Sequence, residues 1–442
     1  MNMKKIYSSV YEKIFESSIA RGREKSGDYY PLRPSLVLGH DPLIAMIVDD
    51  FKAAGFKIDK NVRSRLLFVA DHFAPPSTAE RADILKKFLD FSYGEKIENV
   101  KVFEGICHQL MVESEMARPF SYIAGSDSHT VMAGAISSIA SGYGSMDILS
   151  AMTTGVIYEK KFPVRGVNFY GDKAPFITGR DLGLEVIRLI GEGEGNNTVL
   201  EYSDNTSGCV FMDDRYAISN ASIECGASAG IFSPDEILLG HLIMRGGPGT
   251  KRSYEKLFDE FTADVKPDYE VNVHIDAGSM NSKIALPHDF SKIIDVAGVS
   301  NVSVDQVFVG SCASGRISDF QYMCEAIGSI SKKARRKNVK KDPKVRLIVT
   351  PSSQKIYLEA IKLGYIEKLI GFGAVITNPS CGPCGGIDKG LIGSGEVCLS
   401  TSTRNFRGRM GSMDSDIYIA SPLTAIFTAY AGKITAPEEF YL

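Results

Sequence analysis

The sequence predicts an α/β protein. Short apolar runs of strand length alternate along the chain with segments of helical periodicity. Polar clusters follow several of these runs directly, and ligand sites form at that edge of an open α/β sheet. The 442 residues correspond to roughly three domains, at about 150 residues each. We expect these domains at residues 1–162, 163–287 and 288–442.

Helix starts are marked most clearly in the first third of the chain. Asp41 and Pro42 have the pattern of an N-cap followed by proline at the first helical position, and this helix should stop at Gly55. The segment 77–80 (Ser-Thr-Ala-Glu) has the capping-box pattern, so another helix should begin there. A helix rich in small residues is expected at about 131–140.

Strand-like runs lead to the polar clusters. The run 65–70 should be a buried strand that ends at Asp71 and His72, and the run at 122–124 should end at the polar segment 125–130. Three later runs (307–309, 374–377 and 397–400) lead to Cys312, to Cys381 and to the loop 403–409. The polar clusters are therefore expected to meet at the carboxyl edges of the sheets.

Composition excludes several classes of protein. Hydrophobic residues make up 44% and charged residues 23% of the chain, which is ordinary globular usage. The net charge of −3 argues against a nucleic-acid binder. Eight cysteines are too sparse for a secreted disulfide scaffold. The N-terminus has no apolar signal core, and the run 43–48 is too short to span a bilayer. We expect a soluble cytoplasmic protein.

Three cysteines form the most informative pattern. Cys381 and Cys384 are two residues apart, and Cys312 follows a strand-like run upstream. A Cys-x-x-Cys pair alone is more often a zinc site or a redox pair, but the third cysteine favours an iron–sulfur cluster. Three thiolates leave one corner of such a cluster free for substrate. The other cysteines are interpreted as core residues: Cys107, Cys209, Cys225, Cys324 and Cys398.

Histidines near carboxylates form a second pattern. A carboxylate beside a histidine fixes its tautomer and raises its basicity, and a dehydrating enzyme needs such an acid to protonate a leaving hydroxyl. Any single histidine could equally be a satisfied buried side chain. The members of this pattern are Asp71, His72, His108, Asp127, His129 and Glu224.

Three further segments could bind anions, and only the loop 403–409 is kept as a candidate site. Arg404 and Arg409 bracket a glycine-containing loop that suits a polycarboxylate, although the loop taken alone could be ordinary surface. The segment 191–195 (Gly-Glu-Gly-Glu-Gly) follows a helical pattern and lacks phosphate-loop spacing, so we interpret it as a turn. The basic run 332–341 is interpreted as a solvated helix end and loop.

Together these segments resemble the aconitase superfamily, and within it the separate large subunits of the 3-isopropylmalate dehydratase branch. The match runs from about Lys13 to the last strand. It rests on DHFAP at 71–75, GICHQ at 105–109, GSDSHT at 125–130, SNASIECGA at 219–227, VFVGSC at 307–312, NPSCGPC at 378–384 and TRNFRGR at 403–409.

The resemblance implies three doubly wound α/β/α domains around a [4Fe-4S] cluster held by Cys312, Cys381 and Cys384, with Asn220 near the cluster. It implies that Asp71 pairs with His72, Asp127 with His108, and Glu224 with His129. Substrate contacts are implied for His40, Asp41, Ser128, Arg404 and Arg409. It also implies that a serine base lies on a separate small subunit.

The resemblance further implies a hydro-lyase that dehydrates and rehydrates a hydroxy di- or tricarboxylate, with His72 as the expected proton donor and isopropylmalate as the first choice of substrate. Homoaconitate, citrate-type acids, dimethylmalate and methyl-substituted malates stay open, as does a cluster-free RNA-binding protein. Relatives usually have threonine and asparagine where this chain has Ala313 and Ser314, and asparagine at Thr403. These departures bear on the hydrogen bonding of the cluster.

Overall fold

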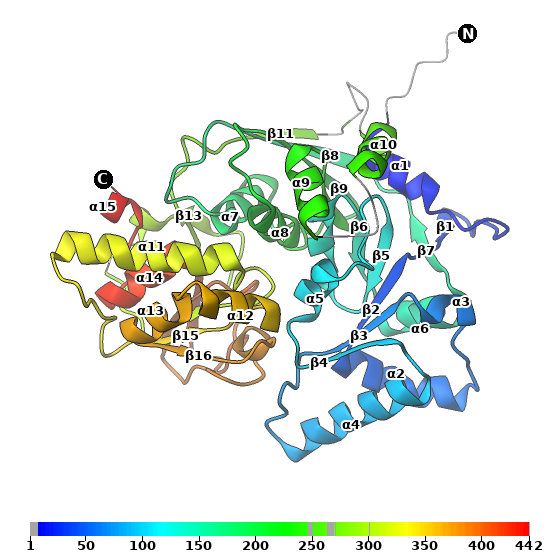
Figure 1. The fold of residues 1–442 in the computed structure, drawn as a ribbon, viewed down its shortest axis with the longest axis horizontal. Helices are drawn as coiled ribbons and strands as arrows, with labels where there is room; N and C mark the ends of the chain where they lie inside the picture. The colour runs from blue at the N-terminus through cyan, green and yellow to red at the C-terminus, as the bar shows by residue number, and fades with distance from the viewer. Residues whose placement is uncertain (1–7, 246–250, 263–268, 270, 300, 442) are drawn as a thin grey trace, which may run out of the picture.

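The computed structural model describes residues 8–245, 251–262, 269, 271–299 and 301–441. Three regions follow one another in chain order in Figure 1, coloured blue to cyan, green, and yellow to red, and each is built on its own sheet. Helices cover these sheets, and the predicted α/β class is confirmed. No helix in these described ranges is long and apolar enough to cross a membrane.

The first sheet has five parallel strands in the order β4-β3-β2-β5-β6. The order reverses between β2 and β5, which makes this the topological switch point of a doubly wound sheet. The strands are β2 (Leu36–His40), β3 (Leu66–Ala70), β4 (Asn99–Val102), β5 (Tyr122–Gly125) and β6 (Ile139–Gly142). Its helices are α2 (Asp41–Ala53), α3 (Lys60–Arg63), α4 (Ala79–Gly94), α5 (Cys107–Glu113) and α6 (Ser145–Thr154).

Two predicted helix caps are wrong by one residue. The N-cap of α2 is His40, whose Nδ1 accepts from the Leu43 amide at 3.5 Å. Asp41 cannot serve there because its carboxylate accepts amide hydrogens from the β3–α4 loop instead. The N-cap of α4 is Thr78, whose hydroxyl accepts from the Arg81 amide at 3.3 Å.

The helix predicted at about 131–140 is confirmed only for its first part, residues 131–136, and it is not an α-helix. The chain forms a 3₁₀-helix, η1 (Ser128–Ile136), and then enters β6. Close packing explains the difference, because a Cβ on Gly134 would lie 1.8 Å from the carbonyl oxygen of Gly230. Ser137 then ends the turn in the left-handed region at φ 56°. Small residues therefore serve tight packing here, and not α-helix formation.

The second sheet has four parallel strands in the order β10-β9-β8-β11. They are β8 (Val164–Tyr170), β9 (Val199–Asn205), β10 (Ala229–Phe232) and β11 (Val271–Asp276). The associated helices are α7 (Gly179–Ile190), α8 (Met212–Ala221), α9 (Glu236–Arg245) and α10 (Lys251–Phe261). The segment 191–195 follows the end of α7 as turns, in agreement with the prediction.

The third sheet has seven strands in the order β13-β12-β18-β17-β14-β15-β16. The strands are β12 (Lys283–Ala285), β13 (Ile293–Asp295), β14 (Gln306–Val309), β15 (Arg346–Val349), β16 (Ala374–Ile376), β17 (Val397–Ser400) and β18 (Asp416–Ala420). The flanking helices are α11 (Ile317–Ala334), α12 (Gln354–Lys362), α13 (Tyr365–Phe372), α14 (Pro422–Ala431) and α15 (Glu438–Tyr441), with short 3₁₀-helices η2 (Val296–Gly298) and η3 (Gly382–Gly385).

This arrangement confirms the strands predicted at 307–309, 374–377 and 397–400, which lie in β14, β16 and β17. The basic run begins at the end of α11 and continues as exposed loop. The domain boundaries at 162/163 and 287/288 stay a prediction.

The three regions are packed against one another. A helix α1 (Val10–Ser17) and a two-stranded antiparallel sheet, β1 (Tyr29–Leu32) with β7 (Ile157–Lys160), lie beside the first and second regions (Figure 1). Cys312 of the third region packs in the same apolar cluster as Ile106 and Leu110 of the first. The carboxyl edges of the first and third sheets are thereby brought together.

Candidate functional site

A cavity of ≈ 170 Å³ lies where loops of the first and third regions meet. It is several times larger than the ~30 Å³ that a water molecule occupies. Ten residues singled out in the sequence line it: Asp71, His72, His108, Asp127, His129, Cys312, Cys381, Cys384, Arg404 and Arg409. The cavity therefore joins the cysteine, histidine and arginine patterns in one place.

The three cysteines reach the cavity from two loops. Cys312 follows β14, whereas Cys381 and Cys384 lie at the 3₁₀-helix η3, just beyond β16. Cys312 and Cys384 are buried, and all eight cysteines of the chain are free of disulfides. Burial raises the pKa of Cys312 to about 12, so it is protonated at neutral pH unless a cation binds it. Three convergent thiols suit a soft metal centre.

Polar groups touch two of these sulfurs. The buried amide of Asn220 donates to the Cys312 sulfur at 3.2 Å, and the Thr403 hydroxyl lies 3.7 Å from the Cys384 sulfur. Asn220 is on α8 of the second region, so all three regions contribute to the site. Hydrogen bonds to thiolate sulfur stabilise negative charge on it and raise the reduction potential of a bound cluster.

His72 is held by a carboxylate beside the cavity. Its Nδ1 lies 2.7 Å from Asp71 Oδ1 and 3.7 Å from Asp41 Oδ1. Burial alone would lower the pKa of His72, but the carboxylates of Asp71, Asp41 and Asp127 together outweigh burial and raise it to about 9. His72 is therefore cationic at neutral pH and can give up a proton.

His40 and Asp41 do not line the cavity, but both contact His72. The rings of His40 and His72 stack with centroids 4.4 Å apart. Asp41 is fully buried and accepts the backbone amides of His72 at 3.1 Å and Phe73 at 3.0 Å. Both residues thus position the His72 segment, and their predicted substrate contacts stay a prediction.

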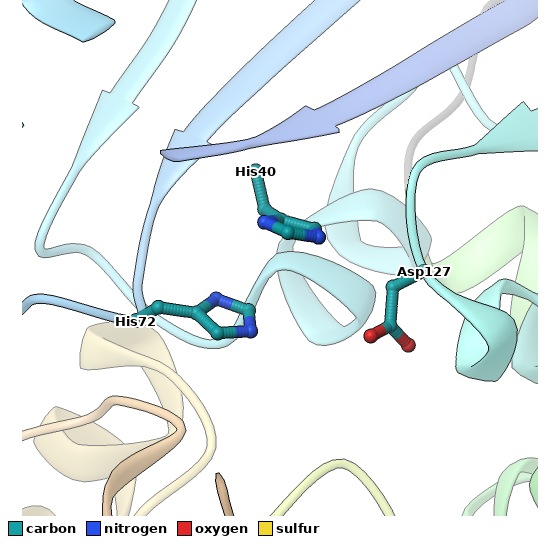
Figure 2. Close-up of side chains that lie close together, drawn as sticks. All are labelled: His40, His72 and Asp127. Carbon is teal, nitrogen blue, oxygen red and sulfur yellow. The ribbon is translucent and has the colours of Figure 1, made fainter. Parts of the chain in front are cut away.

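Figure 2 shows His40, His72 and Asp127 grouped around a common space. Each offers a ligand atom within 4.8 Å of the others, as do Asp41, Asp71 and His72 in a second group. Such sets can hold a metal ion. However, Nδ1 of His72 is engaged by Asp71, and Nε2 of His40 lies 3.2 Å from the Ser126 carbonyl oxygen. These contacts describe hydrogen-bonded histidines better than metal ligands.

His108 faces Asp127 across 3.4 Å, measured from Nε2 to Oδ1. Burial lowers the pKa of His108, so the ring is neutral at pH 7. Asp127 is buried too, but the nearby histidines outweigh burial and hold its pKa well below the usual range. This pair combines a permanent carboxylate with a neutral imidazole.

His129 lies between Asn220, which contacts Cys312, and Glu224. Its Nδ1 lies 3.0 Å from the Asn220 side-chain oxygen, and its Nε2 lies 3.8 Å from Glu224 Oε1. Burial lowers the pKa of His129 to about 3, so the ring is neutral. Its Nε2 is buried and makes no hydrogen bond to any described residue. A buried polar atom without a partner, at the wall of a cavity, indicates a missing ligand group.

Arg404 is oriented by two of the predicted residues. Its Nε donates to Glu224 Oε1 at 2.9 Å, and its Nη2 donates to the Ser128 hydroxyl at 3.1 Å. Glu224, Ser128 and Asn220 do not line the cavity, so they support the residues that do. Arg409 lines the cavity directly, and its buried Nε has no partner among the described residues. Both guanidinium groups can bind an anion in the cavity.

Two residues near the cavity were not predicted as functional. Cys107 is buried in an apolar cluster, which confirms its interpretation as a core residue, and it also lines the cavity beside His108, with 3.7 Å from its sulfur to Nδ1. Its position in the segment 105–109 was the available signal. Arg180 is buried on α7 and donates to the Ser402 carbonyl, and its charge acts on Glu224 and Cys312. No sequence pattern marked it.

Known proteins resemble the chain over most of its length. The model of the aconitase family (aconitate hydratase) matches residues 12–432. The 3-isopropylmalate dehydratase large subunit of Aliarcobacter butzleri is 37% identical over 436 residues, covering 98% of this chain and 99% of that protein. The 3-isopropylmalate dehydratase large subunit 1 of Thermotoga maritima is 34% identical over 434 residues, covering 97% of this chain and 98% of that protein.

A solved structure shares the fold. The aconitase X of Thermococcus kodakaraensis, in its holo-form, matches with a TM-score of 0.51 at 15% sequence identity. The match covers 94% of this chain and 97% of that one. It supports the arrangement of the sheets and carries nothing about the chemistry.

Proposed function

The chain belongs to the aconitase family, and from this premise we propose that it is the large subunit of an iron–sulfur hydro-lyase that interconverts 2- and 3-isopropylmalate by dehydration and rehydration. The observation that carries the proposal is the convergence of Cys312, Cys381 and Cys384 on the cavity that also holds the His72–Asp71 pair. The full-length similarity to 3-isopropylmalate dehydratase large subunits supports the choice of substrate.

Cys312, Cys381 and Cys384 would hold a [4Fe-4S] cluster. Three thiolates leave one iron without a protein ligand, and the bound cluster supplies a Lewis acid for the substrate's hydroxyl and carboxylate. Two cavity-wall atoms without partners among the described residues, Nε2 of His129 and Nε of Arg409, support a group bound here. The free state of all eight cysteines fits the reducing cytoplasm, where we place the protein.

His72 would deliver the proton that the leaving hydroxyl takes up. It is cationic at neutral pH because Asp71 stabilises its charge, and it lines the cavity. Asp71 fixes Nδ1, which leaves Nε2 as the atom that can donate toward the cavity. In the reverse direction the neutral ring takes a proton from water as the hydroxyl forms.

Arg404 and Arg409 would bind the carboxylates of the substrate. Glu224 and Ser128 hold the Arg404 guanidinium through Nε and Nη2, so one nitrogen of the fork, Nη1, stays available to a ligand. The neutral His108 and His129 rings provide hydrogen bonds without adding charge. A dianionic substrate thus meets two guanidinium groups and one imidazolium.

A separate small subunit would complete the site. The two relatives named above are large subunits, which supports a heteromeric enzyme. We propose that the small subunit carries the family's fourth domain, with the serine base that removes the proton from the neighbouring carbon. The substrate's side chain would be selected partly by that subunit.

Co-expression with a candidate small subunit tests the function. We expect the cluster-loaded complex to dehydrate isopropylmalate, as followed by the ultraviolet absorption of the unsaturated acid. Citrate, homocitrate and dimethylmalate serve as comparison substrates. A complex that carries its cluster and turns over one of these acids, but not isopropylmalate, would contradict the proposed substrate.

A further inference from the structure

A concave basic surface lies at the edge of the first sheet opposite to the catalytic cavity. It comprises two hollows of ≈ 670 and ≈ 500 Å³ that share Arg33, Ser35 and Arg65 and therefore adjoin. We name it the arginine groove. Its walls include the residues that precede the first sheet's strands: Arg33 and Ser35 before β2, Arg65 before β3, and Ser121 before β5.

The charge of the arginine groove is strongly unbalanced. Five arginines line the two hollows (Arg21, Arg23, Arg33, Arg65 and Arg118). Asp59 is the acidic residue in the lining, and its carboxylate already accepts the Asn61 amide at 2.7 Å. The whole chain has a net charge of −3, so this positive surplus is local and does not follow from the composition.

Most of these guanidinium groups are unused within the described part of the chain. The side chains of Arg21, Arg23, Arg33 and Arg118 are exposed and form no hydrogen bond or ion pair to any described residue. Arg65 is half-buried and donates to the carbonyls of Asn61 and Pro34, both at 2.9 Å. Burial, and then the nearby charge of Arg33, lower the pKa of Arg65. An anion would relieve this repulsion.

Two hydroxyls of the groove are already engaged within the chain. Ser35 donates to the Tyr122 carbonyl at 3.1 Å, and Ser121 donates to the Arg118 carbonyl at 2.7 Å. Their protons are committed, and the exposed guanidinium groups without a described partner are the cationic donors of the groove. Guanidinium forks bind phosphate and carboxylate groups in bidentate geometry. The volumes of the two hollows lie in the range of small-molecule sites.

We propose that the arginine groove binds a compact small-molecule polyanion whose two or more negative groups are phosphates or carboxylates. The site is distinct from the catalytic cavity, because the strands that begin at the groove end at His40 or shortly before Asp71 and Asp127. A strand of five residues spans about 17 Å, at ~3.3 Å per residue. Ligand binding at one edge is thus measurable without turnover at the other.

Titration calorimetry on the full-length chain tests the proposal with two probes, inorganic pyrophosphate and tricarballylate. We expect at least one to bind with a dissociation constant of about 1 mM or tighter. The double variant Arg23→Gln/Arg33→Gln, in which neither native side chain has a described partner, should weaken that affinity at least about tenfold. Preference for pyrophosphate or for tricarballylate distinguishes a phosphate ligand from a carboxylate one.

Two matched variants locate the bound probe. Arg252→Gln removes an exposed arginine on α10 that does not line the groove, and it should leave the affinity unchanged. Arg409→Gln should also leave it unchanged if the probe binds outside the catalytic cavity. The proposal is overturned if neither probe binds at millimolar concentration, or if Arg409→Gln abolishes binding that Arg23→Gln/Arg33→Gln preserves. Binding of single-stranded RNA together with failure of both probes overturns it as well.

Discussion

His72 owes its proposed role to its two nearest carboxylates. Desolvation favours a neutral imidazole, and this is the state of His108 and His129 at the cavity wall and of His40 next to His72. His72 differs because Asp71 lies 2.7 Å from its Nδ1. His72 is thus the one of these four histidines that can act as a general acid at neutral pH.

Replacing His72 by glutamine should therefore remove the acid while leaving the cavity's shape largely intact. We expect kcat of the complete enzyme to fall by about 10²- to 10⁴-fold, the range for loss of a general acid. The iron content and the visible absorption of the cluster should be unchanged, since His72 is not among the proposed ligands. Unimpaired turnover of this variant would show that another group supplies the proton.

The pH dependence follows from the same pair. Because the pKa of His72 is raised to about 9, the acid is present below that pH and is lost as the pH rises through it. Asp71→Asn removes the main group that raises the pKa, so the alkaline limb of kcat should move to lower pH by about one to three units.

Asp90→Asn is the matched control for this shift. Asp90 pairs with Lys86 on the exposed face of α4, and its replacement should leave the limb in place. An alkaline limb of kcat that is unchanged in Asp71→Asn would contradict the assignment of His72 as the acid.

At the scale of secondary-structure elements, the sequence predicted those strands whose positions are set by a local run of apolar residues. The strands β3, β14, β16 and β17 were found as apolar runs, and the polar segments that follow them were expected at the sheet edges. The helix expected at about 131–140 is a 3₁₀-helix that ends at Ile136, because tertiary packing decides that segment. A pattern of small residues does not reveal that Gly134 lies against the backbone of β10.

This packing can be tested with alanine substitutions. Gly134→Ala places a Cβ 1.8 Å from the Gly230 carbonyl oxygen, and backbone cannot move aside as a flexible side chain can. We expect the free energy of unfolding to fall by about 3 kcal/mol, at the upper end of overpacking costs. Urea denaturation of the full chain measures it.

Gly240→Ala on α9 is the control. A Cβ at this position meets no atom within 4 Å, and alanine is the better helix former. The unfolding free energy should therefore be unchanged or slightly higher. Equal destabilisation by both substitutions would contradict the role of close packing at Gly134.

At the scale of the whole molecule, the site exists because loops from distant parts of the chain are fastened together. The Cys381 amide donates to the Asp71 carbonyl at 3.1 Å, and the Asn378 side chain donates to the Ala74 carbonyl at 2.7 Å. Further along, the Ile106 amide donates to the Ser352 carbonyl at 2.9 Å. These bonds join the first region to the third and hold the cysteines beside the histidines.

Hydrogen bonds between residues far apart in the chain are also what the sequence could not predict. Residue types and strand ends suggested which side chains would gather, and ten of them line one cavity. The sequence could not predict which of these residues line the cavity and which support it from outside. Asp41 and Glu224, for example, are oriented by hydrogen bonds to residues distant in the chain. For the same reason the sequence did not place Cys107, which is buried in the core as predicted, at the cavity wall, and Arg180 carried no signal.

The iron content after anaerobic reconstitution tests the central claim most directly. The full chain treated with iron and sulfide should hold about four irons. Cys398→Ser, a buried cysteine of β17 with the Gln306 side chain beside it, should hold as many. Cys384→Ser should lose the cluster or retain far less iron. Retention of the full iron content by Cys384→Ser, or uptake of a single zinc by the unaltered chain, would contradict the account.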